Sequence, residues 1–229
     1  MRVEVPEILR DLSEDSDAAK LLKSYYYSTS QPGRALFSGS RFNTLGHGAS
    51  GDVKPDEFCP ADIAAVLCLG VRLKGDAVVD LLECRKDAVR KHLGELRQDA
   101  DLWDPDQVDI EQKGGHASEL WRLLREVVDI GPVKTSKLMA RKRPRLVPIY
   151  DKWVGSVLHL ESPEGYWTKY RDLMLTEEDG VPLHVRLQDL IVEAGLSEAV
   201  TPLRACDVIL WYWANPRQEI PRNEVLGQR

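Results

Sequence analysis

The sequence lacks the features that mark secreted, membrane-spanning and metal-cluster proteins. Its 229 residues include only four cysteines, and no two of them form a CxxC pair. A disulfide framework or a zinc site is therefore not expected, and free thiols fit a reducing cytoplasm. No apolar run approaches the roughly 20 residues of a membrane span, and the first residues, MRVEVPEILRDLSED, contain no apolar signal-peptide core. We expect a cytoplasmic protein that contacts no membrane.

Positive charge is scarce overall but concentrated in one place. The net charge of −6 argues against a protein that binds polyanions over its whole surface. Between Ile130 and Tyr150, however, there are six basic residues and no acidic one, which leaves −12 for the rest of the chain. These basic residues are Lys134, Lys137, Arg141, Lys142, Arg143 and Arg145. Such a stripe can bind one phosphate backbone, although a solvated, arginine-rich helix end has the same composition.

Apolar residues recur at helical spacing through most of the chain, which predicts a mainly α fold. We expect helices near residues 16–25, 60–69, 75–83, 85–96, 116–128, 152–160, 164–175, 182–194 and 202–214, and a basic helix after Pro132. Residues 34–54, with the glycines of LGHGASGD, are the least helical, and we expect an extended segment or hairpin followed by a mobile loop. There is no internal repeat and no low-complexity run.

The predicted elements divide the chain into two helical regions that form one compact, two-lobed unit. Residues 1–115 are the N-terminal helical region, including the extended segment near 34–54. Residues 116–215 contain the basic helix and the C-terminal helices, and residues 216–229 form a tail. The acidic, turn-rich segment 99–115 is the expected connector.

The stretch 129–154, DIGPVKTSKLMARKRPRLVPIYDKWV, combines a tight corner, a basic helix and an aspartate. Gly131 allows the backbone conformation that a hairpin needs, and Pro132 suits a first helical position, where its missing N–H costs nothing. The exposed N–H groups of that first turn form a site for a phosphate. Asp151 then precedes another apolar helix, and in isolation an aspartate in this place is an N-cap.

This arrangement resembles the helix-hairpin-helix (HhH-GPD) DNA glycosylase superfamily, which includes endonuclease III and the adenine-mismatch, 8-oxoguanine and alkyladenine glycosylases. Residues 130–135, IGPVKT, match its hydrophobic-glycine hairpin and the start of the following helix. Residues 147–151, VPIYD, match the segment that carries the catalytic aspartate, twenty positions after Gly131. The resemblance implies a two-lobed helical fold with a central helix-hairpin-helix that binds double-stranded DNA, without a cofactor or an obligate protein partner.

The resemblance also implies a role for each matching residue. Asp151 would stabilise the positive charge that develops on the sugar when an N-glycosidic bond breaks, or would activate water. Because a duplex hides that bond, the nucleotide must be flipped out and the adjacent backbone held firmly. The implied DNA-binding residues are Gly131, Pro132, Val133, Lys134, Thr135 and Lys137. No metal is required, but in the family the hairpin carbonyls, here near Asp129 and Gly131, can hold a monovalent cation.

The sequence departs from the family pattern in three places. Asp129 replaces the usual first glycine of the hairpin. The strand-cleaving members have a nucleophilic lysine two residues after the hairpin glycine, where this chain has Val133. Lys134 is its neighbour, but a shift of one residue turns a helical side chain by about 100°. The four-cysteine iron–sulfur loop of some relatives is absent. We therefore expect a monofunctional glycosylase that leaves an abasic site.

The residues that recognise the base are poorly specified. Arg41, Phe42 and Asn43 could line a pocket for a planar ligand, or they could equally anchor their segment to the core. Trp103 and Trp153 are further candidates for a pocket or a wedge. Trp211 and Trp213 are also candidates, although core or cap aromatics are the more common interpretation of the run 210–213.

Several functions remain open. The chain is also similar to a group of small bacterial proteins with this same core, and some of these resemble antiviral glycosylases that act on phage-modified cytosines such as glucosylated hydroxymethylcytosine. Repair of oxidised or alkylated purines is the alternative enzymatic function. A different class is a non-catalytic helix-hairpin-helix module, in which Asp151 is only a helix cap. In a third class, the basic helix contacts an acidic partner protein.

Overall fold

The computed structural model describes residues 3–47, 54–107, 110–160 and 162–216, and it confirms the mainly α fold. The helices are α1 (Asp17–Tyr27), α2 (Pro60–Leu67), α3 (Gly75–Val79), α4 (Lys86–Gly94), α5 (His116–Arg125), α6 (Pro132–Lys142), α7 (Lys152–Val157), α8 (Tyr166–Met174), α9 (Leu183–Glu193) and α10 (Pro202–Ala214). Short 3-10 turns are at Glu7–Leu9, Ser38–Arg41 and Pro105–Gln107. The strands in these ranges form two small antiparallel hairpins, β1 (Thr29–Gln31) with β2 (Arg34–Ala35) and β3 (Glu177–Glu178) with β4 (Val181–Pro182).

Local sequence signals explain where several helices begin. Ser16 caps α1, because its Oγ accepts a hydrogen bond from the Ala19 N–H at 3.1 Å. Thr201 caps α10 in the same way, and prolines occupy the first turns of α2, α6 and α10. The predicted helices 75–83 and 85–96 form one run, in which a π-helical turn at Asp80–Cys84 joins α3 to α4. Of the predicted glycine-rich loop, residues 48–53 lie outside the described residues.

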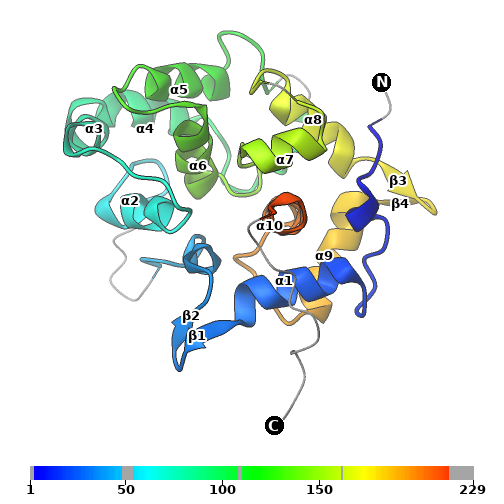
Figure 1. The fold of residues 1–229 in the computed structure, drawn as a ribbon. Coiled ribbons are helices and arrows are strands. Elements are labelled where there is room, and N and C mark those ends of the chain that lie inside the picture. Colours follow the sequence, from blue (N-terminus) through cyan, green and yellow to red (C-terminus); the bar gives the residue numbers. More distant parts are fainter. Residues whose placement is uncertain (1–2, 48–53, 108–109, 161, 217–229) are drawn as a thin grey trace.

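Helix α10 lies at the centre of the C-terminal half (Figure 1), where it packs against α1, α7 and α9. A second group contains α2, α4, α5 and α6, in which α4 contacts α5, α5 contacts α6, and α6 contacts the sequence-distant α2. Helix α1 therefore packs with the C-terminal helices, whereas α5 and α6 pack with N-terminal ones. The predicted boundary between residues 115 and 116 does not coincide with these two groups.

The predicted basic stripe on the surface is wrong, because α6 packs against both α2 and α5. Its basic side chains are mostly buried, with Lys137, Arg141 and Lys142 each 6% exposed and Arg143 1% exposed. Arg141 and Lys142 form ion pairs with Asp62 of α2, which is fully buried. Arg143 donates hydrogen bonds to the carbonyls of neighbouring loops. These charges therefore hold the core together and cannot bind a nucleic-acid backbone.

None of the helices in the described ranges combines the length and the apolar character that crossing a bilayer requires. The four cysteines are free thiols, of which Cys206 is buried and Cys84 is exposed.

Candidate functional site

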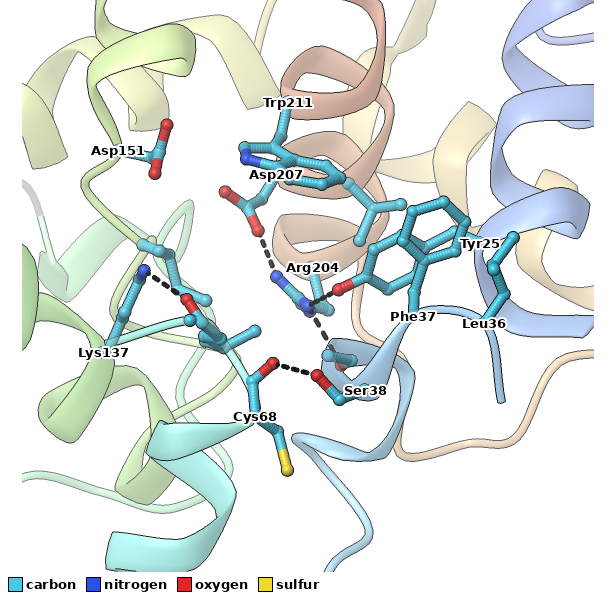
Figure 2. Close-up of a pocket in the computed structure, with 15 residues that line it drawn as sticks. Tyr25, Leu36, Phe37, Ser38, Cys68, Lys137, Asp151, Arg204, Asp207 and Trp211 are labelled. Atoms are coloured by element: carbon cyan, nitrogen blue, oxygen red, sulfur yellow. Dashed lines mark hydrogen bonds and ion pairs between the residues drawn. The ribbon is translucent and has the colours of Figure 1, made fainter. Parts of the chain in front are cut away.

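A cavity of about 260 Å³ lies where α10 faces α6 and the start of α7. Figure 2 shows its aromatic wall, formed by Tyr25, Phe37 and Trp211. The Tyr25 and Phe37 rings are stacked, with centroids 5.1 Å apart and planes 15° apart. Trp211 is edge-on to both rings. Such a wall suits a flat, unsaturated ligand that can pack against the rings.

The rest of the lining is charged, with Lys137 and Asp151 facing Arg204 and Asp207 of α10 across the cavity (Figure 2). We call these four residues the charged wall. Asp151 is at the N-cap of α7, where its Oδ1 accepts a hydrogen bond from the Trp153 N–H at 2.9 Å. Asp151 therefore caps a helix and also lines a cavity, so the two interpretations of this residue from the sequence are compatible.

The segment before Asp151 is held on two sides. The Tyr150 N–H donates to Oγ of Ser136 on α6 at 3.0 Å. The Tyr166 hydroxyl on α8 donates to the Ile149 carbonyl at 2.6 Å. Because residues 149 and 150 are fixed to two helices, the carboxylate that follows them has a defined position in the cavity wall.

Lys137 was predicted on a DNA-facing surface, but it lines the cavity. Its ammonium group donates to the Leu69 carbonyl at 3.0 Å, and the residue is only 6% exposed. Burial lowers the pKa of Lys137, while the negative charges of Asp151 and Asp207 oppose that shift. The structure thus brings Lys137 together with Asp151 in the charged wall of the cavity, and not in a contact with the DNA backbone.

Arg204 and Asp207 form a buried ion pair one turn apart on α10. Arg204 also donates to the Tyr25 hydroxyl at 2.9 Å and to the Gly39 carbonyl at 3.2 Å, which joins the charged wall to the aromatic wall. Burial raises the pKa of Asp207 to about 6, although Arg204 acts in the opposite direction.

Gly39 must be a glycine for the aromatic wall to form. A Cβ at this position would lie 2.0 Å from the Tyr25 hydroxyl oxygen.

We expect Gly39→Ala to displace Tyr25 and to lower the free energy of unfolding by about 1–3 kcal/mol, as overpacking does elsewhere. Urea unfolding measures this change. Gly94→Ala is the matched control, since no atom lies within 4 Å of its added Cβ; an equal loss in both variants would contradict the steric explanation.

The turn between α5 and α6 has a different geometry from the one predicted. Asp129 has a φ of 75°, so this residue adopts the left-handed conformation, which aspartate tolerates better than most side chains. Gly131 has a φ of −88° and needs no glycine-specific conformation. The Lys134 ammonium lies 2.7 Å from both the carbonyl oxygen and the Oδ2 of Asp129, and it lowers the pKa of that carboxyl group. This local ion pair stabilises the hairpin.

The hairpin carbonyls do not fit the monovalent cation that the resemblance implied. The Asp129 carbonyl accepts from Lys134, and the Ile130 carbonyl accepts from Arg125 at 3.0 Å. The Gly131 carbonyl accepts from the Thr135 N–H at 3.0 Å. The chain itself therefore supplies hydrogen-bond donors where the glycosylases that its sequence resembles can hold a cation.

We expect the hairpin to be independent of potassium. The melting temperature should be equal in potassium chloride and in tetramethylammonium chloride at one ionic strength, because the Lys134 ammonium already donates to the Asp129 carbonyl. Lys134→Met should melt at a lower temperature in tetramethylammonium and recover partly in potassium, whereas Lys20→Met on the exposed face of α1 should show no such recovery. A loss of wild-type stability on removal of potassium would contradict this account.

The remaining predicted DNA-binding residues are at or near the start of α6. Pro132 is its first residue, as predicted, and Gly131 is its N-cap. Pro132, Val133 and Lys134 are partly exposed, but Thr135 is fully buried. The Thr135 side chain therefore cannot contact a phosphate.

Of the seven pocket candidates from the sequence, only Trp211 lines the cavity beside Asp151. Arg41 is exposed, whereas Phe42 is 1% exposed in the core. Asn43 donates to the Ala199 carbonyl at 2.9 Å, so this segment is anchored to the core. Trp103 stacks on His184 with centroids 4.5 Å apart, and Trp153 lies under the Lys152 ammonium.

Most of the residues that form the cavity were not found from the sequence. They include Tyr25, Phe37, Arg204 and Asp207, and Trp211 was interpreted mainly as core. One signal was present: Arg204 and Asp207 are opposite charges three positions apart in an otherwise apolar helix. Charges in a buried helix are rare unless they are paired, and they often mark a site.

The described residues form a helical protein with a cavity that is lined by an aromatic wall and a charged wall. Residues 18–214 match the model of a family described as "Family of unknown function (DUF6308)", and the chain belongs to this family. Every residue that lines the cavity falls within the matched range. A search of curated proteins and a search of solved structures found no match.

Proposed function

We propose that the protein is a DNA N-glycosylase with an HhH-GPD-like fold that flips out and excises a modified base, with Asp151 as the catalytic carboxylate. One observation carries this proposal. Asp151, twenty positions after the hairpin glycine, lines a cavity that joins a stacked aromatic wall to charged side chains. The turn that connects α5 to α6 supports the same assignment, because it joins two contacting helices ahead of the aspartate.

The flipped base enters the cavity and packs against the Tyr25–Phe37 stack and Trp211, as aromatic side chains do around extruded bases. Its sugar lies toward Asp151, whose carboxylate stabilises the positive charge that develops as the N-glycosidic bond breaks. Tyr25 and Phe37 thus join Trp211 as the proposed base-pocket residues, in place of the other candidates from the sequence.

The first turn of α6 holds the DNA backbone through its free N–H groups. Lys134 adds a charge there, although its ion pair with Asp129 weakens its attraction for a phosphate. The exposed Lys74 follows the cavity-lining Leu69 and Gly70, and it adds positive charge beside this turn, where it interacts with Asp129. Replacing Lys74 with alanine should therefore reduce the salt dependence of DNA binding.

Base removal proceeds without strand cleavage, because Val133 occupies the position of the lysine nucleophile in strand-cleaving relatives. Lys137 is the amine that faces the cavity, and its ammonium is hydrogen-bonded to Leu69. Borohydride trapping tests this part of the proposal, with no covalent DNA adduct expected. An adduct that forms in the wild type and disappears in Lys137→Met would overturn the monofunctional assignment.

The proposed substrate is a modified base, either a phage-modified cytosine such as glucosylated hydroxymethylcytosine, in a defence role, or an oxidised or alkylated purine, in a repair role. A non-catalytic DNA-binding module is the second candidate, and the hydrogen bond from Trp153 N–H to Asp151 favours it, because a helix cap alone would explain this bond.

Incubation with DNA distinguishes the two functions. The substrates are DNA from unmodified and base-modified phages and oligonucleotides with oxidised or alkylated purines. A monofunctional glycosylase makes at least one of these DNAs cleavable by alkali while its strands stay intact before alkali treatment. DNA that is bound but never becomes alkali-labile would support the binding module and overturn the enzyme.

A further inference from the structure

The cavity contains a second carboxylate that the proposed chemistry does not use. Asp207 is 4% exposed and lines the cavity opposite Asp151 (Figure 2). Its Oδ2 accepts a hydrogen bond from Arg204. Within the described residues, no hydrogen bond reaches its Oδ1. A buried carboxyl group with one oxygen fixed and the other free can act on a ligand in the cavity.

We propose that Asp207 is a second catalytic residue, the general acid that protonates the base as it leaves. This inference rests on the proposed glycosylase function and specifies its substrate class. The substrate is a base that is neutral when attached to the sugar and has an unprotonated ring nitrogen or carbonyl oxygen. Cationic alkylated purines do not belong to this class, because they already carry the positive charge that makes a base a good leaving group.

The proposed step balances in protons and electrons. The Asp207 Oδ1–H proton passes to the base, and the electron pair of the C1′–N bond leaves with the base. A water molecule adds its oxygen to C1′ and transfers a proton to the Asp151 carboxylate. Asp207 is left as a carboxylate next to Arg204; after the base departs, solvent returns the proton of Asp207 and takes up the proton that Asp151 gained. Asp151 and Asp207 thus have separate tasks, as paired carboxyl groups do in other glycoside-cleaving sites.

The surroundings of Asp207 favour a protonated carboxyl group more than those of a surface aspartate. Burial and the negative charge of Asp151 raise its pKa to about 6, against the attraction of Arg204 and Lys137. Two tyrosines of α8, Tyr166 and Tyr170, are neutral neighbours, since burial and the Asp207 charge raise their pKa values. The remaining titratable neighbours are Tyr25 and Tyr26 of α1 and Cys206 of α10, and burial raises the pKa of each.

The sign of the pH dependence follows from this pKa. Asp207 can donate a proton only in its acid form, and that form is lost as the pH rises through about 6. Release of a neutral base should therefore slow by about tenfold per pH unit above this value. Release of a cationic base should not show this decline.

Single-turnover base release tests the inference with two DNA probes, one carrying 5-hydroxymethylcytosine and one carrying 7-methylguanine. Below pH 6, Asp207→Asn should release 5-hydroxymethylcytosine at least about 10²-fold more slowly than the wild type, the usual minimum for loss of a general acid. Its pH profile should become flat, and Asp207→Glu should restore the decline with pH. Urea unfolding identifies any variant that fails to fold.

If Asp207→Asn does not fold, the pH profile of the wild type still tests the inference. Its release of 5-hydroxymethylcytosine should decline above about pH 6, where Asp207 loses its proton. Three results would overturn the role of Asp207 but leave the glycosylase proposal intact. The first is a wild-type profile without this decline, and the second is that Asp207→Asn releases each base as fast as the wild type does. The third is release of 7-methylguanine without release of 5-hydroxymethylcytosine. No base release from any DNA would overturn both.

Discussion

Asp151→Asn is expected to slow base release by about 10²–10³-fold, the range typical for loss of one group that stabilises transition-state charge. Asparagine has the same shape and is as good an N-cap as aspartate, so the hydrogen bond from the Trp153 N–H is kept. Folding stability and DNA affinity should therefore change little. Single-turnover kinetics, urea unfolding and equilibrium DNA binding measure the three quantities separately.

Ser16→Ala provides the matched control for the capping role. Ser16 caps α1 as Asp151 caps α7, and removing its oxygen should cost about 1 kcal/mol of stability without slowing base release. The comparison separates loss of a cap from loss of a reacting carboxylate. Asp151→Asn with wild-type kinetics would show that Asp151 is a cap and nothing more.

Asp62→Ala is expected to have the largest effect on stability. The Asp62 side chain is fully buried and pairs with both Arg141 and Lys142, whose side chains are 1% and 2% exposed. Removing it leaves two buried cations without their carboxylate, and breaking a buried ion pair in this way costs about 3–5 kcal/mol. Asp62 also accepts a hydrogen bond from the Cys59 N–H at the start of α2, so that helix loses its cap as well.

The loss should be partly recovered at high pH. Burial already lowers the pKa of Lys142, and Asp62 opposes this shift, so removing Asp62 lowers it further. A folded-state pKa below the unfolded value means that the unfolded chain binds more protons, and stability then rises with pH. Urea unfolding of Asp62→Ala between neutral and alkaline pH measures this recovery.

Asp17→Ala is the control for the buried ion pair, since its pair with Lys20 is exposed and should contribute little. Equal unfolding free energies for Asp17→Ala, Asp62→Ala and the wild type would contradict the role assigned to the buried cluster. Such a result would also remove the explanation for the inward orientation of the basic side chains of α6.

The same residues show which parts of the structure a sequence can predict. Ser16, Pro132 and Asp151 act through neighbours within three positions, and their helices begin where predicted. The basic run failed as a surface prediction because its acidic partner, Asp62, is 79 positions away from Arg141. Unless the contact between α2 and α6 is known, a buried run of basic residues cannot be distinguished from a solvent-exposed one.

For a similar reason, only one side of the cavity could be predicted from the sequence. Asp151 was found through its spacing from Gly131, which is a local pattern. The opposite wall depends on the packing of α1 against α10, where Arg204 joins Tyr25 over 179 positions. By contrast, Lys134 lies only five positions from Asp129, so the ion pair of the hairpin was within reach of sequence reasoning.

The central claim, that this chain removes bases from DNA, is tested most directly by mass spectrometry of the small molecules released from base-modified phage DNA. We predict free modified base, one for each abasic site that forms in the DNA, and release about 10²–10³-fold slower when Asp151→Asn replaces the wild type. Release of nucleotides in place of free base, or no release from this DNA and from DNA with damaged purines, would contradict the claim.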